Sequence, residues 1–287
     1  MYFKITIAML AFAANSVLCR LALAQNHIDP MSFSLLRVVS GAVVLGILFL
    51  LSASQSTTKI SLQWRFKDGF FLALYIIALS VAYVKIDAGV GALLLFGTVQ
   101  LTMVFYGLLN GEKINLQKGS GLTLALAGII LLLLPDAHAP DLLYSMVMII
   151  SGIAWAAYSI LGKTAENSFA GTLTNFIVAT PLVLLAALFF FKSMHFDLQG
   201  ILLALVSGGL TSSGAYILWY SIVKKIDRIT ASTVQLSVPC LAILGGSLFI
   251  GESVSFRVVL SSAIVLCGIL LVIFAVSKNS AVKAVQH

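Results

Sequence analysis

Amides, hydroxyls and aromatic rings stand in the middle of long apolar stretches of this chain, where they could bind a small solute. A polar side chain surrounded by hydrocarbon costs free energy unless it is hydrogen-bonded or hydrated. We therefore expect these groups to line a cavity that suits a zwitterionic or neutral, partly apolar molecule. A polyphosphorylated molecule would call for several deep Arg or Lys side chains. The expected cavity residues are Asn15, Tyr83, Gln100, Trp155, Tyr158, Tyr216, Tyr220 and Gln235.

The spacing of these residues leaves a second interpretation open, in which they only pack helices together. Trp155 and Tyr158 are three residues apart and would share one helix face. Ser212, Tyr216 and Tyr220 follow one another at intervals of four and would form a stripe along another helix. Aromatic stripes commonly pack a core, and buried amides can bridge two helices as well as line a cavity.

Charged residues are scarce in the apolar stretches. None of the ten Asp and Glu residues falls near the middle of one, which argues against a proton relay on a buried carboxylate. Arg37 could attract a carboxylate, but we favour its reaching the membrane interface or pairing with Asp29, and we expect Arg20 to reach the interface too. Glu112 and Glu252 each follow Gly at a predicted helix end, where they would hold helix ends or gate contacts. Proton coupling is the alternative for these two carboxylates.

The sequence contains no motif for a cofactor, a metal or a catalytic centre. Its three cysteines each stand alone in an apolar stretch, without the spacing of a metal site. No histidine falls in an apolar stretch, and there is no H-E-x-x-H or phosphate-binding Gly-rich loop. We therefore expect no cofactor, no metal and no enzyme activity. An intramembrane enzyme and a structural membrane subunit remain alternatives to a protein that binds a solute.

Composition fixes the environment of the chain. Of its 287 residues, 60% are hydrophobic and 9% are charged, and the mean hydropathy is +1.09. Soluble domains carry about 25% charged residues, so a soluble enzyme, a disordered chain and a nucleic-acid-binding protein are excluded. About 20 apolar residues cross a bilayer as a helix. Ten apolar windows fit this length: 5–24, 31–51, 69–86, 89–110, 119–135, 141–162, 171–191, 200–222, 229–250 and 257–276.

The Lys and Arg residues between these windows predict the orientation. With the N-terminus in the cytoplasm, twelve of them fall in cytoplasmic segments and three in outer loops. Positive residues concentrate on the cytoplasmic side, so both termini are expected there, in a bacterial-type inner membrane. The first window resembles a signal peptide ending in Ala22-Leu23-Ala24, but Arg20 beside that site favours a retained first helix.

The chain matches itself when it is shifted by 140 positions. Lys85-Ile86-Asp87 then falls on Lys225-Ile226-Asp227, and Gly111-Glu112 falls on Gly251-Glu252. Such matches carry weight because charged residues are rare in this chain. Each copy would hold five helices, and an odd number inverts the second copy in the membrane. Inverted repeats are typical of secondary transporters that bind substrate between their halves.

These motifs resemble the drug/metabolite transporter superfamily, specifically its EamA-type permeases, over essentially the whole chain. The Gly-Glu pairs are similar to the family's pattern, as is Trp155 with Lys163 eight residues later. Leu236-Ser237-Val238-Pro239 resembles the family's Pro-bearing ninth helix, whereas Phe12 stands where the first helix often has Trp. The resemblance implies a ten-helix carrier, often an exporter of amino acids or other small metabolites.

The combined expectation is an all-α integral membrane protein with ten transmembrane helices in two inverted five-helix repeats. The repeats would cover residues 1–136 and 141–277, with a cytoplasmic tail at 278–287. It would move a small-molecule substrate by alternating access, surrounded by the lipid bilayer and without a nucleic-acid partner. By the resemblance and the mid-depth polar residues, helices one, three, four, six, eight and nine would line the cavity. Monomer and homodimer both remain open.

Overall fold

The computed structural model describes residues 2–55, 62–109, 116–134, 139–225, 235 and 237–285. This part of the chain is helical apart from turns, short connections and an isolated antiparallel bridge between Ile28 and Phe196. The helices are α1 (Tyr2–Ala24), α2 (Pro30–Gln55), α3 (Phe66–Ala82), α4 (Ala88–Leu109), α5 (Leu116–Leu133), α6 (Leu142–Gly162), α7 (Ser168–Phe189), η1 (Phe191–Ser193), α8 (Leu198–Val206), η2 (Ser207–Ser212), α9 (Ser213–Val223), α11 (Ser237–Phe249) and α12 (Phe256–Val285).

Several of these helices have the length and apolar character of a membrane span. Within the described residues, six segments meet both conditions: Phe3–Ala24, Pro30–Leu51, Ala88–Leu109, Leu142–Gly162, Ser168–Phe189 and Leu198–Val223. Shorter apolar helices of the described chain cover Gly119–Leu133, Ser237–Phe249 and Phe256–Gly268. The expected all-α membrane fold is therefore confirmed. The predicted window 229–250 is described only at residue 235 and from residue 237 onward.

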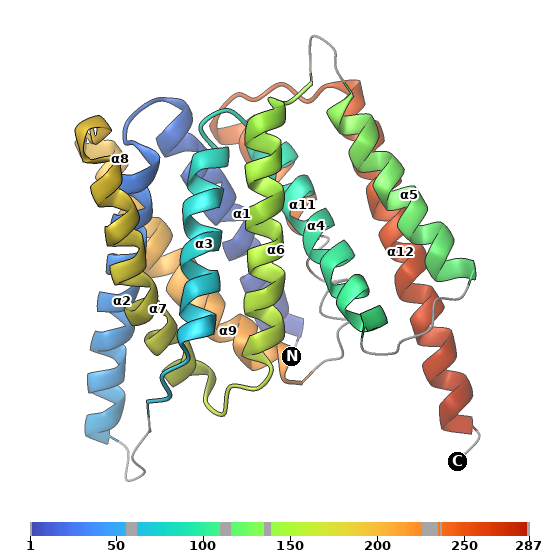
Figure 1. Cartoon of the computed structure of the whole chain (residues 1–287), viewed down its shortest axis with the longest axis horizontal. Helices are drawn as coiled ribbons and strands as arrows, with labels where there is room; N and C mark the ends of the chain where they lie inside the picture. Colours follow the sequence, from blue (N-terminus) through green and yellow to red (C-terminus); the bar gives the residue numbers. More distant parts are fainter. Residues whose placement is uncertain are drawn as a thin grey trace.

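The helices form one bundle with a peripheral pair. In Figure 1, α5 and α12 lie side by side at the right edge, and α2, α7 and α8 lie at the left. Between them, α3 packs against α6, and α4 packs against both α6 and α11. The start of α1, the end of α6, the start of α7 and the end of α12 lie at the lower side of this view. The outer ends of α1 and α12 thus lie on the same side of the bundle.

The exterior of the bundle is apolar, and its buried polar side chains lie within a hydrophobic core. Large hydrophobic side chains point outward, including Leu116 (91% exposed), Phe189 (88%) and Leu248 (78%). In contrast, Arg37 and Asn175 are fully buried. Lipid solvates the apolar exterior, whereas polar side chains avoid hydrocarbon by facing other helices. The interior of the bundle is consequently where the chemistry of this chain is located.

One membrane-spanning segment is interrupted by a π-helical turn. The segment runs through α8, η2 and α9, and η2 (Ser207–Ser212) is the π-helix. At Gly208 the turn lies directly against α2, because a Cβ there would collide with the carbonyl oxygen of Arg37 and the hydroxyl of Ser40. Single π-helical turns occur often at functional sites. Here the turn brings several hydroxyls to the centre of the bundle.

Candidate functional site

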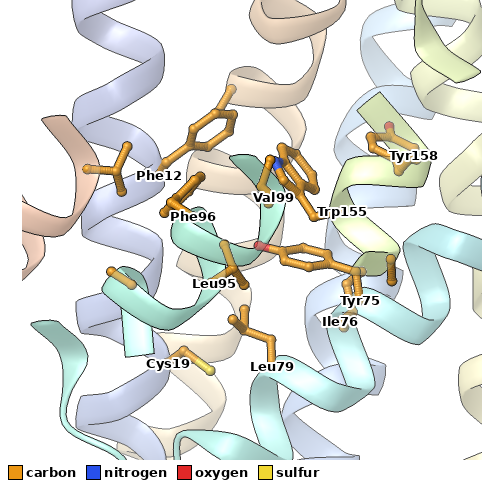
Figure 2. Packing of buried hydrophobic residues seen from close by; sticks show 14 of the residues in the cluster. Phe12, Cys19, Tyr75, Ile76, Leu79, Leu95, Phe96, Val99, Trp155 and Tyr158 are labelled. Atoms are coloured by element: carbon orange, nitrogen blue, oxygen red, sulfur yellow. The ribbon is translucent and has the colours of Figure 1, made fainter. Parts of the chain in front are cut away.

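A cluster of aromatic rings fills the centre of the bundle. We define the aromatic cluster as Phe12, Tyr75, Trp155, Tyr158, Tyr216 and Tyr220, contributed by α1, α3, α6 and α9. The ring centroids are 4.8 Å apart for Tyr75 and Trp155, 5.0 Å for Trp155 and Tyr216, and 4.9 Å for Tyr158 and Tyr220. Figure 2 shows Trp155 and Tyr75 together, with Phe12 on one side and Tyr158 on the other. Four of the eight expected cavity residues therefore meet.

Two expected amides connect helices at this cluster. The indole Nε1 of Trp155 donates a hydrogen bond to Oε1 of Gln235 over 3.1 Å. On the other side, the Ser207 hydroxyl in η2 donates to Oδ1 of Asn15 in α1 over 2.6 Å. Both amides therefore join segments that are distant in the chain, and Asn15 joins α1 to η2.

Some buried polar atoms of the described chain have no hydrogen-bond partner. They include Oε1 of Gln100, the hydroxyl of Tyr158 and Oδ1 of Asn175. Asn175 does donate through Nδ2 to the Tyr220 hydroxyl over 3.1 Å, so its oxygen lies next to the aromatic cluster. Leaving such atoms unpaired costs ~1–3 kcal/mol each. A polar solute or water bound here would satisfy them.

Arg37 is buried at the edge of the aromatic cluster. Its side chain is completely inaccessible. Its Nε donates to the Ser212 hydroxyl over 3.0 Å, and its Nη2 donates to the Tyr216 hydroxyl over 2.8 Å. The guanidinium carbon lies 5.5 Å from the ring centroid of Tyr75. The expectation that Arg37 reaches the membrane interface is therefore wrong, because hydroxyls of η2 and α9 hold it inside.

The expected pairing of Arg37 with Asp29 is wrong as well. Asp29 precedes α2, and its Oδ1 accepts hydrogen bonds from the backbone N–H groups of Met31 (2.9 Å) and Ser32 (3.0 Å). Its Oδ2 accepts one from the backbone N–H of His195 (3.0 Å). The carboxylate thus caps the helix and joins it to the segment before α8, as acidic residues commonly do at helix N-termini.

Arg20 forms a second polar centre, at one end of the bundle. We call Arg20, Asp87 and Glu252 the Arg20 cluster. Nη2 of Arg20 lies 3.0 Å from Oδ1 of Asp87, and its Nε lies 2.9 Å from Oε1 of Glu252. Nη1 donates to the carbonyl oxygens of Tyr83 and Val84 over 3.0 Å each. Arg20 was expected to reach the membrane interface, and it does lie at one end of the bundle. The structure adds two carboxylate partners from distant segments, which the sequence did not indicate.

Glu252 also caps a helix. Its Oε2 accepts a hydrogen bond from the backbone N–H of Ala88, the first residue of α4, over 2.8 Å. Burial raises the pKa of the Glu252 carboxyl above its usual range, although the hydrogen bond from Arg20 opposes that shift. Glu252 thus has the contacts of a helix-end residue and joins α1 to the α3–α4 turn. Glu112 lies outside the described residues.

Tyr83 is placed apart from the other expected cavity residues. It is buried, and its hydroxyl donates to the carbonyl oxygen of Ala88 over 3.4 Å. The tyrosine ring lies against Gly91 and Met148, where a Cβ added at Gly91 would collide with it. Its carbonyl contacts Arg20, so it belongs with the Arg20 cluster.

Comparison with known proteins identifies the family of this chain. The sequence model of the EamA-like transporter family matches residues 1–134 and, separately, residues 142–274. The chain belongs to the EamA-like transporter family. An uncharacterized protein of Pseudomonas aeruginosa is 43% identical over 267 residues, which cover 93% of this chain and 92% of that protein.

Two further relatives of this EamA-like protein carry the name of a transporter. The uncharacterized transporter YoaV of Bacillus subtilis is 24% identical, over 88% of this chain and 90% of YoaV. An uncharacterized transporter of Archaeoglobus fulgidus is 24% identical, over 86% of this chain and 90% of the length of that transporter. A protein crystal structure with 18% identity covers 93% of this chain and 98% of that one at a TM-score of 0.62, which shows a shared fold.

Family and fold together make this EamA-like protein a multi-pass membrane transporter. The expected resemblance is thereby confirmed, and a small-molecule substrate and a lipid environment follow from the family. Sequence reasoning did not include Tyr75, which contacts both Trp155 and Arg37. The sequence did contain a signal for Tyr75, because it carries a hydroxyl in the middle of a predicted apolar window, as Tyr216 does.

Proposed function

We propose that this EamA-like transporter exports a small zwitterionic or neutral metabolite, such as an amino acid, across the bacterial inner membrane by alternating access. The observation that carries the proposal is the aromatic cluster with unpaired polar atoms at its side. Trp155, Tyr158 and Tyr216 offer aromatic faces, and the Tyr158 hydroxyl and Asn175 Oδ1 have no partner. Neutral polar groups beside apolar rings are typical of small-molecule sites.

The proposed architecture has ten helices in two inverted repeats, at residues 1–136 and 141–277, followed by a cytoplasmic tail at 278–287. Two separate matches of the same family model, to residues 1–134 and 142–274, support it. The substrate would bind between the repeats, as in other inverted-repeat carriers. The aromatic cluster draws on both halves, because Phe12 and Tyr75 come from the first and Trp155 and Tyr216 from the second.

The Arg20 cluster supports the alternating-access part of the proposal. It joins three segments at one end of the bundle: α1 through Arg20, the α3–α4 turn through Asp87, and the α11–α12 connection through Glu252. In the proposed orientation this end faces away from the cytoplasm. The ion pairs would hold that end closed, and their rupture would open it toward the outside.

Counterflow in proteoliposomes tests the proposed function. Purified full-length protein is reconstituted and loaded with unlabelled amino acids, and uptake of a labelled one is measured. We expect saturable exchange that Trp155→Ala and Tyr216→Ala reduce at least ten-fold. Trp64→Ala and Tyr106→Ala are matched controls, because these side chains are 54% and 37% exposed.

Two results would contradict the proposal. An intramembrane enzyme or a structural subunit would give no saturable flux of any solute. A carrier with its site elsewhere would give flux that Trp155→Ala and Tyr216→Ala leave at the level of the control variants.

Alkaline-phosphatase fusions test the proposed orientation. With both termini in the cytoplasm, fusions after Asp136 and Asp197 should be active, and fusions after Lys67, Lys118 and Arg228 should be silent. Activity after Lys67 would reverse the orientation, because the fused enzyme folds only outside the cytoplasm.

A further inference from the structure

We propose that Arg37 is the anion-binding residue of the substrate site, and that the transported solute carries one carboxylate on an apolar body. This inference rests on the proposed function and assigns a charge to its substrate. The geometry that carries it is a buried guanidinium with free donors at the edge of the aromatic cluster.

Arg37 has no carboxylate partner among the described residues. Arginine stays protonated in proteins, so its charge persists in the interior. The ion pairs of the described chain join Arg20 to Asp87 and Glu252, Arg65 to Asp68, and His27 to Asp197. A buried charge without a counter-charge is strongly unfavourable. A charged residue inside a membrane protein is a candidate for a functional site, and a ligand carboxylate would supply the missing counter-charge here.

The remaining donors of Arg37 have the arrangement that a carboxylate requires. A guanidinium has five N–H groups. One on Nε binds Ser212 and one on Nη2 binds Tyr216, whereas Nη1 has no partner. The free donors therefore lie on the adjacent terminal nitrogens Nη1 and Nη2. A carboxylate can bind such a pair with both oxygens, which is the strong bidentate form of this interaction.

The side chains around Arg37 indicate what the rest of the ligand is made of. Tyr75 lies 5.5 Å from the guanidinium carbon, and its own ring packs against Trp155 at 4.8 Å. Tyr216 binds the guanidinium through its hydroxyl and contacts Trp155 through its ring. A ligand bound to Arg37 would thus place its body against aromatic faces. One guanidinium beside these rings matches a monocarboxylate with an apolar or aromatic body.

Matched solutes that differ in charge test the inference. The full-length protein is reconstituted for counterflow with L-phenylalanine, with 3-phenylpropanoate, which lacks the ammonium group, and with L-phenylalaninamide, which lacks the carboxylate; L-leucine, 4-methylpentanoate and L-leucinamide form a second series. We expect the wild-type protein to accept carboxylates of at least one series and to bind the corresponding amide at least ten-fold more weakly. Ten-fold corresponds to ~1.4 kcal/mol.

Variants of Arg37 separate binding from a purely structural role. Arg37→Gln should lose the ten-fold preference for the carboxylate over the amide. Arg37→Lys, which keeps the charge but not the paired donors, should retain part of it. Arg257→Gln is the control at a half-buried arginine near the start of α12, whose Nη1 donates to the carbonyl oxygen of Leu134. Apparent melting temperatures verify folding, and the preference is a ratio within one protein, so a merely structural role would not change it.

The outcomes that overturn the inference differ from failure of the proposed function. The inference fails if wild-type protein exchanges amides as well as carboxylates, or if Arg37→Gln and Arg37→Lys both keep the full preference. If wild-type protein exchanges no solute of any charge class, the proposed function fails, and the inference fails with it.

Discussion

The Arg20 cluster allows a quantitative test of how burial controls ion-pair strength. Arg20 binds Asp87 at 3.0 Å and Glu252 at 2.9 Å, so the two contacts have nearly equal geometry. Their exposure differs, because the side chain of Asp87 is 46% exposed and that of Glu252 is 11% exposed. An exposed ion pair contributes ~0–1 kcal/mol. A buried hydrogen bond to a charged group contributes ~1.5–3 kcal/mol.

These magnitudes predict different effects for two isosteric substitutions. Glu252→Gln should raise the population of the state open at this end by about ten-fold to about a hundred-fold, since ~1.4 kcal/mol is a factor of ten. Asp87→Asn should raise it by at most about five-fold, as expected for an exposed pair. Glu252 also accepts the backbone N–H of Ala88, which adds to the effect expected of replacing Glu252.

Cys19 provides the assay. It precedes Arg20 in α1 and is completely buried among the core residues shown in Figure 2. In a variant with Cys240 and Cys267 replaced by Ser, a membrane-impermeant maleimide can react only with Cys19. Its labelling rate therefore reports how often the end of the bundle closed by the Arg20 cluster opens. Labelling tracks the open population when opening is fast compared with reaction. Equal rates in the two variants, or no change in either, would refute the reasoning from burial.

Three further predictions follow from other contacts. Because the pKa of Glu252 is raised, its carboxylate is neutralised at milder acidity than an ordinary Glu; as the pH falls through that pKa, the Cys19 labelling rate of wild-type protein should approach that of Glu252→Gln, whose side chain does not titrate. Gly208→Ala should cost ~1–3 kcal/mol by overpacking against α2, measured as a lower melting temperature, whereas Gly214→Ala has no atom within 4 Å and should not be destabilising. Asp141→Ala should cost ~0.5–2 kcal/mol in the same measurement, because Asp141 caps α6 by accepting the N–H of Tyr144.

Hydropathy located the helices well because the lipid sets their length. The windows 31–51 and 171–191 compare with α2 at Pro30–Gln55 and α7 at Ser168–Phe189. The rule that mid-span polar residues face inward also succeeded, since Trp155, Tyr158, Tyr216 and Tyr220 meet. Both rules use only local sequence and the physics of the solvent.

The arginines show where such local reasoning fails. The snorkelling argument treats one helix alone in lipid, so it placed Arg37 at the interface and named no partner for Arg20. In the bundle, Arg20 binds Glu252, which is 232 residues away in the chain, and Arg37 binds Tyr216, which is 179 residues away. These partners depend on helix packing, which a single sequence does not reveal. The contact between the carbonyl oxygen of Tyr83 and Arg20 depends on packing in the same way.

The π-helical turn changes how the eighth predicted span must be drawn. An α-helix closes hydrogen bonds four residues back, whereas a π-turn closes them five back and so contains one residue more. Each residue of an α-helix advances by about 100°, so α9 is out of phase with α8 by about that angle. A helical wheel drawn through the whole segment therefore assigns Tyr216 and Tyr220 to the wrong face relative to α8. Deleting one residue from η2 would turn both tyrosines away from Trp155 without changing any side chain of the aromatic cluster.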